Sequence, residues 1–486
     1  GQPEVNAVNS SFVDNSSYGV RLRGYAGYPD PLVTINSSSM HSNLGSYDFY
    51  ATLFETPDLT IIDARENYWG PDLATETIGS RIYDHRANPS TSPRVDWCRY
   101  LASEGGAPVL DAYCPDLVVC DEMESWLATD RPYHLTTDLW VCPDTGILEV
   151  GPGVDVRTVK TTPKPNFWVE GTLNVNVGGD PEPPIFGSDA ASPAAGDWKG
   201  LMLVGDEVST IRNAEFRHAT YGLYVSGAAD ATLDGVTASS NDTGLHAAGG
   251  SLVHATNGSF GDGNDGIHMA DSATADLTGV TVGPNIGYGI QVTDSASATL
   301  DGVAVGPNGN YGIHVTDGAS ATLDGVTATE NHTGLYVQGQ GPPTVTAVNS
   351  SFVANTYYGV NVLGWSGYPD PNVTVNTSSI HSNGGGYDYY AASFANPATA
   401  ILDAHDNYWG NTDPAAIGPR IYDHRTNPNT APRVDWCRYL ASEGGAPVLD
   451  AHCPDLVVCG ETESWPATDK PYQVTTDFWV CPGTCL

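Results

Sequence analysis

Hydrophobic and polar positions alternate along most of the chain, in runs of four or five residues. A period of two indicates a β-strand with one buried face, whereas an amphipathic helix needs a period near 3.6. Gly, Asn and Asp residues separate the runs, as is typical of tight turns. The pattern therefore predicts many short strands and excludes a mainly helical fold.

A short repeat runs through the middle of the chain. A glycine followed by an aliphatic residue returns every 22 to 25 positions, at Gly222-Leu223, Gly244-Leu245, Gly266-Ile267, Gly289-Ile290, Gly312-Ile313, Gly334-Leu335 and Gly359-Val360. Strands this short cannot bury a face alone, but stacked turns pair their backbones and share one core. The spacing predicts an all-β solenoid with about 22 residues per turn.

A longer repeat relates the two ends of the chain. Residues 8–13 return at 348–353, Asn67-Tyr68-Trp69-Gly70 returns at 407–410, and residues 95–101 return at 434–440. The offset is 340 and then 339 residues, so we predict tandem units of about 340 residues. We divide the chain into 1–62 (final turns of a first β-helix), 63–130 (a closing module with Cys98, Cys114 and Cys120), 131–402 (a complete β-helix, with a lead-in over 131–200 and regular turns over 201–402), 403–469 (a second closing module) and 470–486 (the lead-in strand of a further unit).

Several motifs carry a family resemblance. They are the Val-Glu-Gly-Thr-Leu strand at 169–173, the Gly-Asp-Trp-Lys-Gly-Leu segment at 196–201, and the two Asn-Tyr-Trp-Gly motifs followed by Ile-Tyr-Asp and Val-Asp. With the 22-residue turn, they resemble right-handed parallel β-helix proteins of the pectate-lyase-like superfamily, and among these the large secreted bacterial surface proteins built from tandem β-helices. The resemblance implies a right-handed parallel β-helix over nearly the whole chain. It says almost nothing about activity.

The cysteines lie outside the regular turns. Eight of the nine form two matching sets: Cys98, Cys114, Cys120 and Cys142, and Cys437, Cys453, Cys459 and Cys481. In a secreted chain, four cysteines per module imply two disulfides with three connectivities. We favour Cys98 with Cys114 and Cys120 with Cys142, because each pair closes a short loop. A zinc site is the alternative, although the spacings do not match paired Cys-x-x-Cys ligands.

The net charge of the chain excludes some classes of binding partner. The 486-residue chain has 57 acidic and 19 basic residues, for a net charge of −38. Such a surface repels nucleic acid and anionic membranes, and no apolar run is long enough to span a bilayer. Disorder is excluded because 40% of the residues are hydrophobic and recur with a regular period. The expected partners are copies of this chain, end to end, and cell-surface glycans, in a secreted, extracellular setting.

The distribution of charge argues against an enzyme. The resemblance implies that a lyase would use Arg or Lys beside Asp-bound calcium, but neither residue type occurs between His218 and Pro419. The Asp residues recur once per turn in Leu-Asp-Gly-Val motifs, which is typical of turn formers. We therefore assign no catalytic residue and no cofactor except calcium. Its weak candidates are Asp262 and Asp265, in a turn that occurs only once.

Aromatic loops interrupt the short repeat on the flank of the predicted solenoid. Tyr25 and Tyr28 in the first copy match Trp365 and Tyr368 in the second. Exposed aromatic residues bind sugars or neighbouring subunits, so these four are glycan or interface candidates. The alternative is that they pack over their own flank. Asn-x-Ser/Thr sequons, beginning at Asn9, make the chain a candidate glycoprotein.

The sequence thus leads to a functional hypothesis. We expect an extracellular structural protein that forms a rigid surface filament, sheath or stalk by end-to-end stacking of β-helices, because open solenoid ends expose unpaired strand edges. An adhesin or carbohydrate-binding surface protein is the alternative. A polysaccharide lyase or hydrolase is the least favoured.

Overall fold

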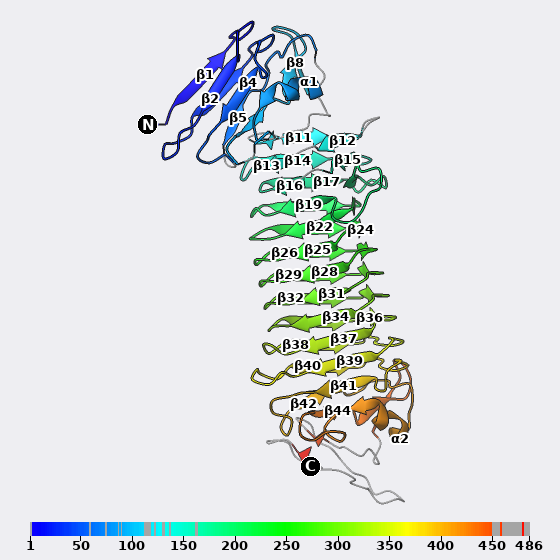
Figure 1. Cartoon of the computed structure of the whole chain (residues 1–486). Coiled ribbons are helices and arrows are strands. Elements are labelled where there is room, and N and C mark those ends of the chain that lie inside the picture. Colours follow the sequence, from blue (N-terminus) through cyan, green and yellow to red (C-terminus); the bar gives the residue numbers. More distant parts are fainter. Residues whose placement is uncertain are drawn as a thin grey trace, which may run out of the picture.

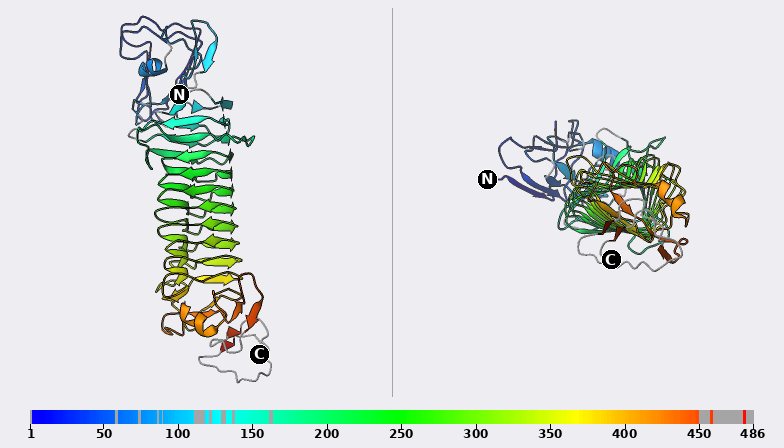
Figure 2. Two further views of the ribbon diagram at one scale, coloured as in Figure 1. Left: turned by 90° about the vertical axis from the view of Figure 1, so that its right-hand side faces the viewer. Right: turned by 90° about the horizontal axis from the view of Figure 1, so that it is seen from below.

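The computed structural model describes residues 2–57, 60–72, 75–85, 87–88, 90–110, 118–120, 123–128, 132–135, 138–160, 164–449, 457–458 and 479–480. These residues form a long parallel β-helix, seen from the side in Figure 1 and along its axis in Figure 2, with a shorter stack of strands at the N-terminal end. The predicted all-β solenoid is confirmed.

Three sheets run along the rod and are parallel throughout. One is built, within the described residues, from thirteen strands: β10 (Val118–Val119), β13 (Leu139–Val141), β16 (Asn166–Val169), β19 (Trp198–Leu203), β22 (Ala219–Val225), β25 (Thr243–Ala247), β28 (Asp265–Met269), β31 (Ile290–Val292), β34 (Tyr311–Thr316), β37 (Thr333–Gln338), β39 (Tyr358–Leu363), β41 (Tyr389–Ala392) and β43 (Ile421–Tyr422). We call it the front sheet.

Two further sheets complete each turn. One runs from β11 (Met123–Trp126) to β44 (Arg433–Asp435), and the third runs from β12 (Tyr133–Leu135) to β36 (Thr327–Ala328). The two thirteen-stranded sheets therefore extend beyond the interval 131–402 at both ends. The N-terminal stack consists of β1 (Glu4–Val8), β3 (Leu32–Asn36), β5 (Ile61–Asp63) and β7 (Arg94–Asp96) beside β2 (Val20–Arg23), β4 (Phe49–Thr52) and β6 (Ile82–Tyr83). The described helices are short: α1 (Thr75–Ser80), α2 (Pro414–Ile417) and a 3₁₀ turn (Gly418–Arg420).

The repeated Gly-aliphatic pairs explain how the turns stack. The aliphatic members, from Leu223 to Val360, point inward and are fully buried. A Cβ added to each preceding glycine would lie 2.5–2.8 Å from the carbonyl oxygen of the next glycine, for every pair from Gly222–Gly244 to Gly334–Gly359. Only glycine allows the backbones to approach this closely, and the column therefore sets the register of the front sheet.

A ladder of buried asparagines closes one corner of the solenoid. Each side chain bonds to the next turn: Asn285 Nδ2 donates to Asn308 Oδ1 (3.0 Å), and Asn308 Nδ2 donates to Asn331 Oδ1 (2.9 Å). The ladder continues through Asn355 and Asn383 to Asp388, which forms an ion pair with Arg420 (2.7 Å). The bonds run along the rod and hold neighbouring turns together.

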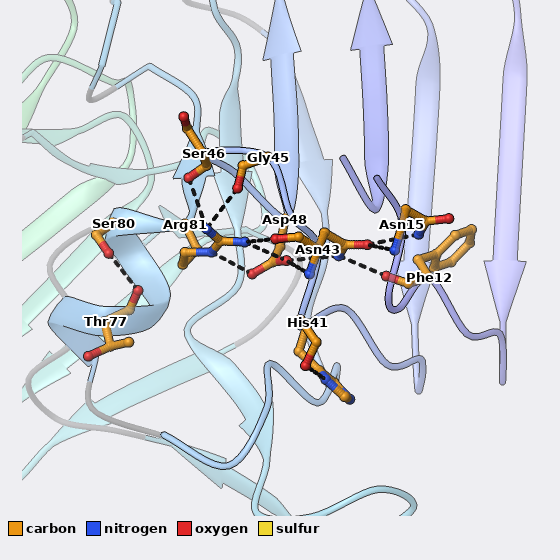
Figure 3. A network of polar contacts seen from close by, with 11 residues as sticks. Phe12, Asn15, His41, Asn43, Gly45, Ser46, Asp48, Thr77, Ser80 and Arg81 are labelled. Carbon is orange, nitrogen blue, oxygen red and sulfur yellow. Dashed lines mark hydrogen bonds and ion pairs between the residues drawn. The ribbon is translucent and has the colours of Figure 1, made fainter. Parts of the chain in front are cut away.

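In the first copy of the long repeat, the asparagine ladder also ends at an aspartate that is paired with an arginine. Figure 3 shows Asn15 donating to Asn43, Asn43 donating to Asp48, and Arg81 holding Asp48 at 2.9 Å. A second guanidinium nitrogen of Arg81 donates to the carbonyl oxygen of Asn43 (2.7 Å). An arginine thus ends the ladder in both copies, where no further asparagine continues it.

The preferred disulfide pairing is confirmed for one pair. Cys120 and Cys142 are bonded, with their Cα atoms 5.0 Å apart. Cys98 and Cys437 each take part in a further disulfide. Cys114, the predicted partner of Cys98, lies outside the described residues, as do Cys453, Cys459 and Cys481.

Replacing Cys142 with serine is expected to lower the free energy of unfolding of the first turns by about 3 kcal/mol, because the bond closes a loop with a sequence separation of 22. The thermal midpoint of the variant, measured by circular dichroism, should fall below that of the oxidised native protein. After reduction the two proteins should melt together. Equal melting before reduction would contradict a stabilising bond.

Within the described part of the chain, no helix has the length and hydropathy needed to cross a bilayer.

Candidate functional site

The outer face of the front sheet carries one continuous row of polar and aromatic side chains. Strand pairing places each member directly beside the next: Tyr224, His246, His268, Gln291, His314, Tyr336, Asn361, Tyr390 and Tyr422. Towards the N-terminus the same row continues through Met202, Trp168 and Trp140. We call residues 224 to 422 of this series the central row. Figure 1 shows its strands from β22 to β41 one above the other.

Register alone brings these residues together. From Tyr224 to Asn361, each lies one position after the inward-facing aliphatic residue of a Gly-aliphatic pair, so its side chain points outward, and Tyr390 and Tyr422 follow the buried Tyr389 and Ile421 in the same way. Between β22 and β37 the members are 22 or 23 positions apart, which makes them remote in sequence but adjacent in space. Neighbouring strands are ~4.8 Å apart, so the stretch from Tyr224 to Tyr390 is about 34 Å long.

A second set of rings lies beside the central row and packs against it. Tyr311 stacks on Tyr336 with ring centroids 4.2 Å apart, and the His314 ring lies 5.4 Å from Tyr311 and 5.6 Å from Tyr288. At the start of the row, Tyr224 stacks on His246 at 5.1 Å with nearly parallel rings. The face is thus a strip of rings supported by other rings.

His314 is the most enclosed imidazole of the row. Only 8% of its surface is exposed, and neither ring nitrogen has a hydrogen-bond partner among the described residues. In the same row, the side-chain oxygen of Asn361, which is also 8% exposed, has no hydrogen-bond partner among the described residues. The same is true of Nδ1 of His246. Buried polar atoms without partners are costly, which points to a ligand that supplies hydroxyl or amino groups.

Burial sets the protonation states along the row. It lowers the pKa of His314 and of His246 to about 4, and repulsion from His268 contributes to both shifts. Burial also raises the pKa of Tyr336 to about 12, helped by the neighbouring Tyr311 and Tyr288. At neutral pH the strip therefore offers neutral imidazoles, which can accept a proton, beside protonated phenols, which can donate one.

Carboxylates flank the central row. On one side, Asp271, Asp294 and Asp317 each follow a row residue by three positions. On the other side, Asp242 comes four positions before His246, and Asp265 comes three positions before His268. Burial lowers the pKa of His268, and Asp265, Asp294 and Asp271 partly oppose that effect. No Lys or Arg lies between positions 218 and 419 to balance these charges.

The structure places the predicted aromatic residues in loops and not on the strands of the front sheet. Tyr25, Tyr28, Trp365 and Tyr368 are 64%, 71%, 42% and 45% exposed. Tyr25 and Tyr28 line a shallow hollow of about 480 Å³ together with Pro3 and Arg21. Their role as glycan or interface residues stays a prediction.

The calcium candidates lie at the edge of the row. Asp262 is exposed at a positive φ of 56°. One oxygen of Asp265 accepts the backbone N–H of Tyr288 at 2.8 Å. Among the residues described, no group of three or more His, Cys, Asp or Glu side chains is arranged to hold a metal ion.

The sequence contained a signal for the row that our predictions did not use. The Gly-aliphatic marker is followed by Tyr, His, His, Gln, His, Tyr and Asn in seven successive turns. We used the marker to set the period and did not consider the next position. The polar and ring-bearing residues there, repeated at an outward-facing site, were the observable sign of a functional face.

Residues 243–399 match the family model for a right handed beta helix region. A search of curated proteins finds no match. Similar solved structures include the periplasmic alginate epimerase AlgG, with a TM-score of 0.47, 13% identity, and coverage of 60% of this chain and 85% of that chain. The A-module of the Azotobacter vinelandii mannuronan C-5 epimerase AlgE4 is also similar, with a TM-score of 0.35, 15% identity, and coverage of 61% and 87%.

These comparisons confirm the fold and correct the function. The right-handed parallel β-helix fold is confirmed by the family model over residues 243–399 and by the pairing of the strands. The hypothesis of a structural filament, sheath or stalk is corrected: the similar solved structures are alginate and mannuronan C-5 epimerases. At 13–15% identity the likeness concerns the fold alone, and neither substrate nor catalytic residues carry over to this chain.

Proposed function

We propose that this right-handed parallel β-helix is a polysaccharide-active protein that holds an extended glycan lengthwise on the central row and acts on it there. The observation that carries the proposal is the unbroken outward strip from Tyr224 to Tyr390, with the buried and unpartnered imidazole of His314 within it. Sugar rings have apolar faces that stack on aromatic rings, and hydroxyl groups that satisfy polar atoms. The repeat of ~4.8 Å per strand suits a chain with one sugar unit above each turn.

His314 and Tyr336 form the best candidate acid–base pair. Their ring centroids are 5.1 Å apart on adjacent strands. The neutral imidazole can accept a proton from the bound sugar. The phenol, whose single O–H donates to Gln338 at 2.9 Å, can return one by turning that O–H from Gln338 to the sugar. Tyr311, stacked on Tyr336, holds the phenol in place.

Secretion belongs to the same proposal. The Cys120–Cys142 disulfide is typical of proteins that fold in an oxidising compartment, where extracellular and periplasmic polysaccharides are also found.

The proposal is tested by measuring binding to a panel of soluble oligosaccharides by calorimetry. Tyr311→Ala and Tyr336→Ala should each weaken binding about tenfold, because a lost ring contact is worth about 1–1.5 kcal/mol. Tyr368→Ala, in an aromatic loop, is the control and should bind like the native protein. Weaker binding by Tyr368→Ala, with native binding by the other two variants, would place the glycan site in the aromatic loops. If no glycan of the panel binds, the proposal is refuted.

Catalysis is tested separately with His314→Gln. We expect turnover to fall by about 10²–10⁴-fold with little change in affinity, since only the proton acceptor is removed. Products are identified by NMR and mass spectrometry of the glycan, which separate chain cleavage, elimination and epimerisation. Tight binding by the native protein without any product would refute the catalytic part of the proposal.

A further inference from the structure

We infer that the glycan held by the central row is cationic, a polysaccharide of amino sugars that carry free ammonium groups. This inference rests on the proposed function, because it specifies the substrate class of the same face.

The first ground is a column of carboxylates along one side of the row. His268, Gln291 and His314 are paired in register across three strands. Asp271, Asp294 and Asp317 each follow one of them by three residues and open equivalent turns, with φ values of 50°, 51° and 54°. Register therefore stacks their side chains along the rod, one per turn, beside the row.

The second ground is the charge on the opposite side. Asp265 pairs in register with Thr243 on the neighbouring strand, and it accepts the N–H of Tyr288 (2.8 Å) through one oxygen. Asp242, one turn away, accepts from Asn264 (3.2 Å). The strip of rings thus runs between acidic groups on both sides, and the sequence supplies no Lys or Arg from 218 to 419.

The third ground is independent of the carboxylates. His314 is more than nine-tenths buried in the strip, and both of its ring nitrogens lack partners among the described residues. A neutral imidazole accepts a hydrogen bond from an ammonium group, which carries three donors. A single amino sugar over this turn would therefore satisfy a buried acceptor and approach the carboxylate column.

Other glycans fit this face less well. A polyuronate would place carboxylates beside the column of Asp271, Asp294 and Asp317 without a cation to neutralise them. An uncharged glycan would stack on the rings but would bring no positive charge to that column. A chain of amino sugars uses all three features at once.

The test compares four oligosaccharides of equal length by calorimetry with the full chain: β-1,4-linked oligomers of glucosamine, N-acetylglucosamine and glucose, and an α-1,4-linked oligomer of galacturonate. The glucosamine oligomer should bind at least about tenfold more tightly than the two neutral ones, and its affinity should fall as salt is raised, because salt screens charge attraction. The galacturonate oligomer should bind most weakly.

A matched pair of variants locates the charge. The triple variant Asp271→Asn, Asp294→Asn, Asp317→Asn should reduce the preference for glucosamine about tenfold, and asparagine tolerates the positive φ of these turns. The control is Asp301→Asn with Asp324→Asn, which removes exposed carboxylates, one per turn, from the neighbouring sheet and should leave the preference unchanged.

Each result has a distinct meaning. Equal binding of the glucosamine and glucose oligomers, or tighter binding of galacturonate, would overturn the cationic substrate while leaving the proposed glycan face intact. Equal loss of preference in the two variants would also overturn it, since the effect would then come from net charge alone. Binding of none of the four would instead count against the proposed function itself.

Discussion

Replacing Asn331 with leucine is expected to destabilise the middle of the solenoid by about 3–5 kcal/mol. Asn331 is fully buried; its amide donates to the carbonyl oxygens of Val305 (3.1 Å) and Thr329 (3.0 Å), and its oxygen accepts from Asn308 (2.9 Å). Leucine satisfies none of these groups. Each buried polar group left without a partner costs about 1–3 kcal/mol, and at least two are affected.

Hydrogen exchange is the appropriate measurement, because a stacked solenoid loses its turns in stages and a single unfolding free energy is then poorly defined. Amides of β37 should exchange faster in the variant, and the midpoint of urea unfolding should fall. Asn310→Leu is the control: this half-buried residue lies two positions from Asn308, and its replacement should change stability by no more than about 0.5 kcal/mol. Similar losses for the two variants would show that the ladder has no special role.

The periodic part of the fold could be predicted from the sequence because one steric requirement repeats. The glycine column needs a residue without a side chain at one point of each turn, and the buried aliphatic residue follows it. Both features leave a pattern in the linear sequence. The same asparagines that we interpreted as turn residues proved to be rungs of a ladder, because their partners lie one turn away and are visible only once the register is known.

The functional face was harder to predict for a related reason. Its residues differ from turn to turn, since Tyr, His, Gln and Asn alternate at the outward position. A catalytic or binding motif of the usual kind groups its residues within a short segment, whereas this face takes one residue from each turn. The aromatic loops attracted attention because they interrupt the repeat, although the repeat itself carries the row.

Comparison of the two copies exposes a second feature that sequence reasoning passed over. His405 bridges Asp403 (2.8 Å) and Asp435 (2.9 Å) at the closing end of the rod. In the first copy the same place is taken by Arg65, which lies 3.0 Å from Asp63 and 3.5 Å from Asp96. Both copies thus have a pair of aspartates at this place. The cation between them is the permanently charged Arg65 in the first copy and the titratable His405 in the second.

Because histidine takes the place of arginine in the second copy, we expect the free energy of unfolding to depend on pH. Burial lowers the pKa of His405, but its bonds and charge attraction to Asp403 and Asp435 outweigh that effect and raise the pKa to about 10. A folded-state pKa above the ordinary 6.5 means that the stabilisation is fully present below pH 6.5 and is lost as pH rises through 10. Its upper limit is on the order of 4–5 kcal/mol, at 1.36 kcal/mol per pKa unit.

His405→Arg should remove this dependence, because it gives the second copy the permanent cation that Arg65 provides in the first. We expect the native protein to lose stability between pH 7 and pH 10 relative to this variant, as measured by urea unfolding across the range. His405→Leu should be destabilised by about 3–5 kcal/mol near pH 7, since two carboxylates at this end of the rod lose their shared cation, and its difference from the native protein should shrink towards pH 10 as the native imidazole loses its proton. Parallel pH profiles for the native protein and His405→Arg would show that the imidazole is not charged in the fold. The carboxylate pair would then have to be stabilised by hydrogen bonds such as the one from Asn376 to Asp403 (3.0 Å).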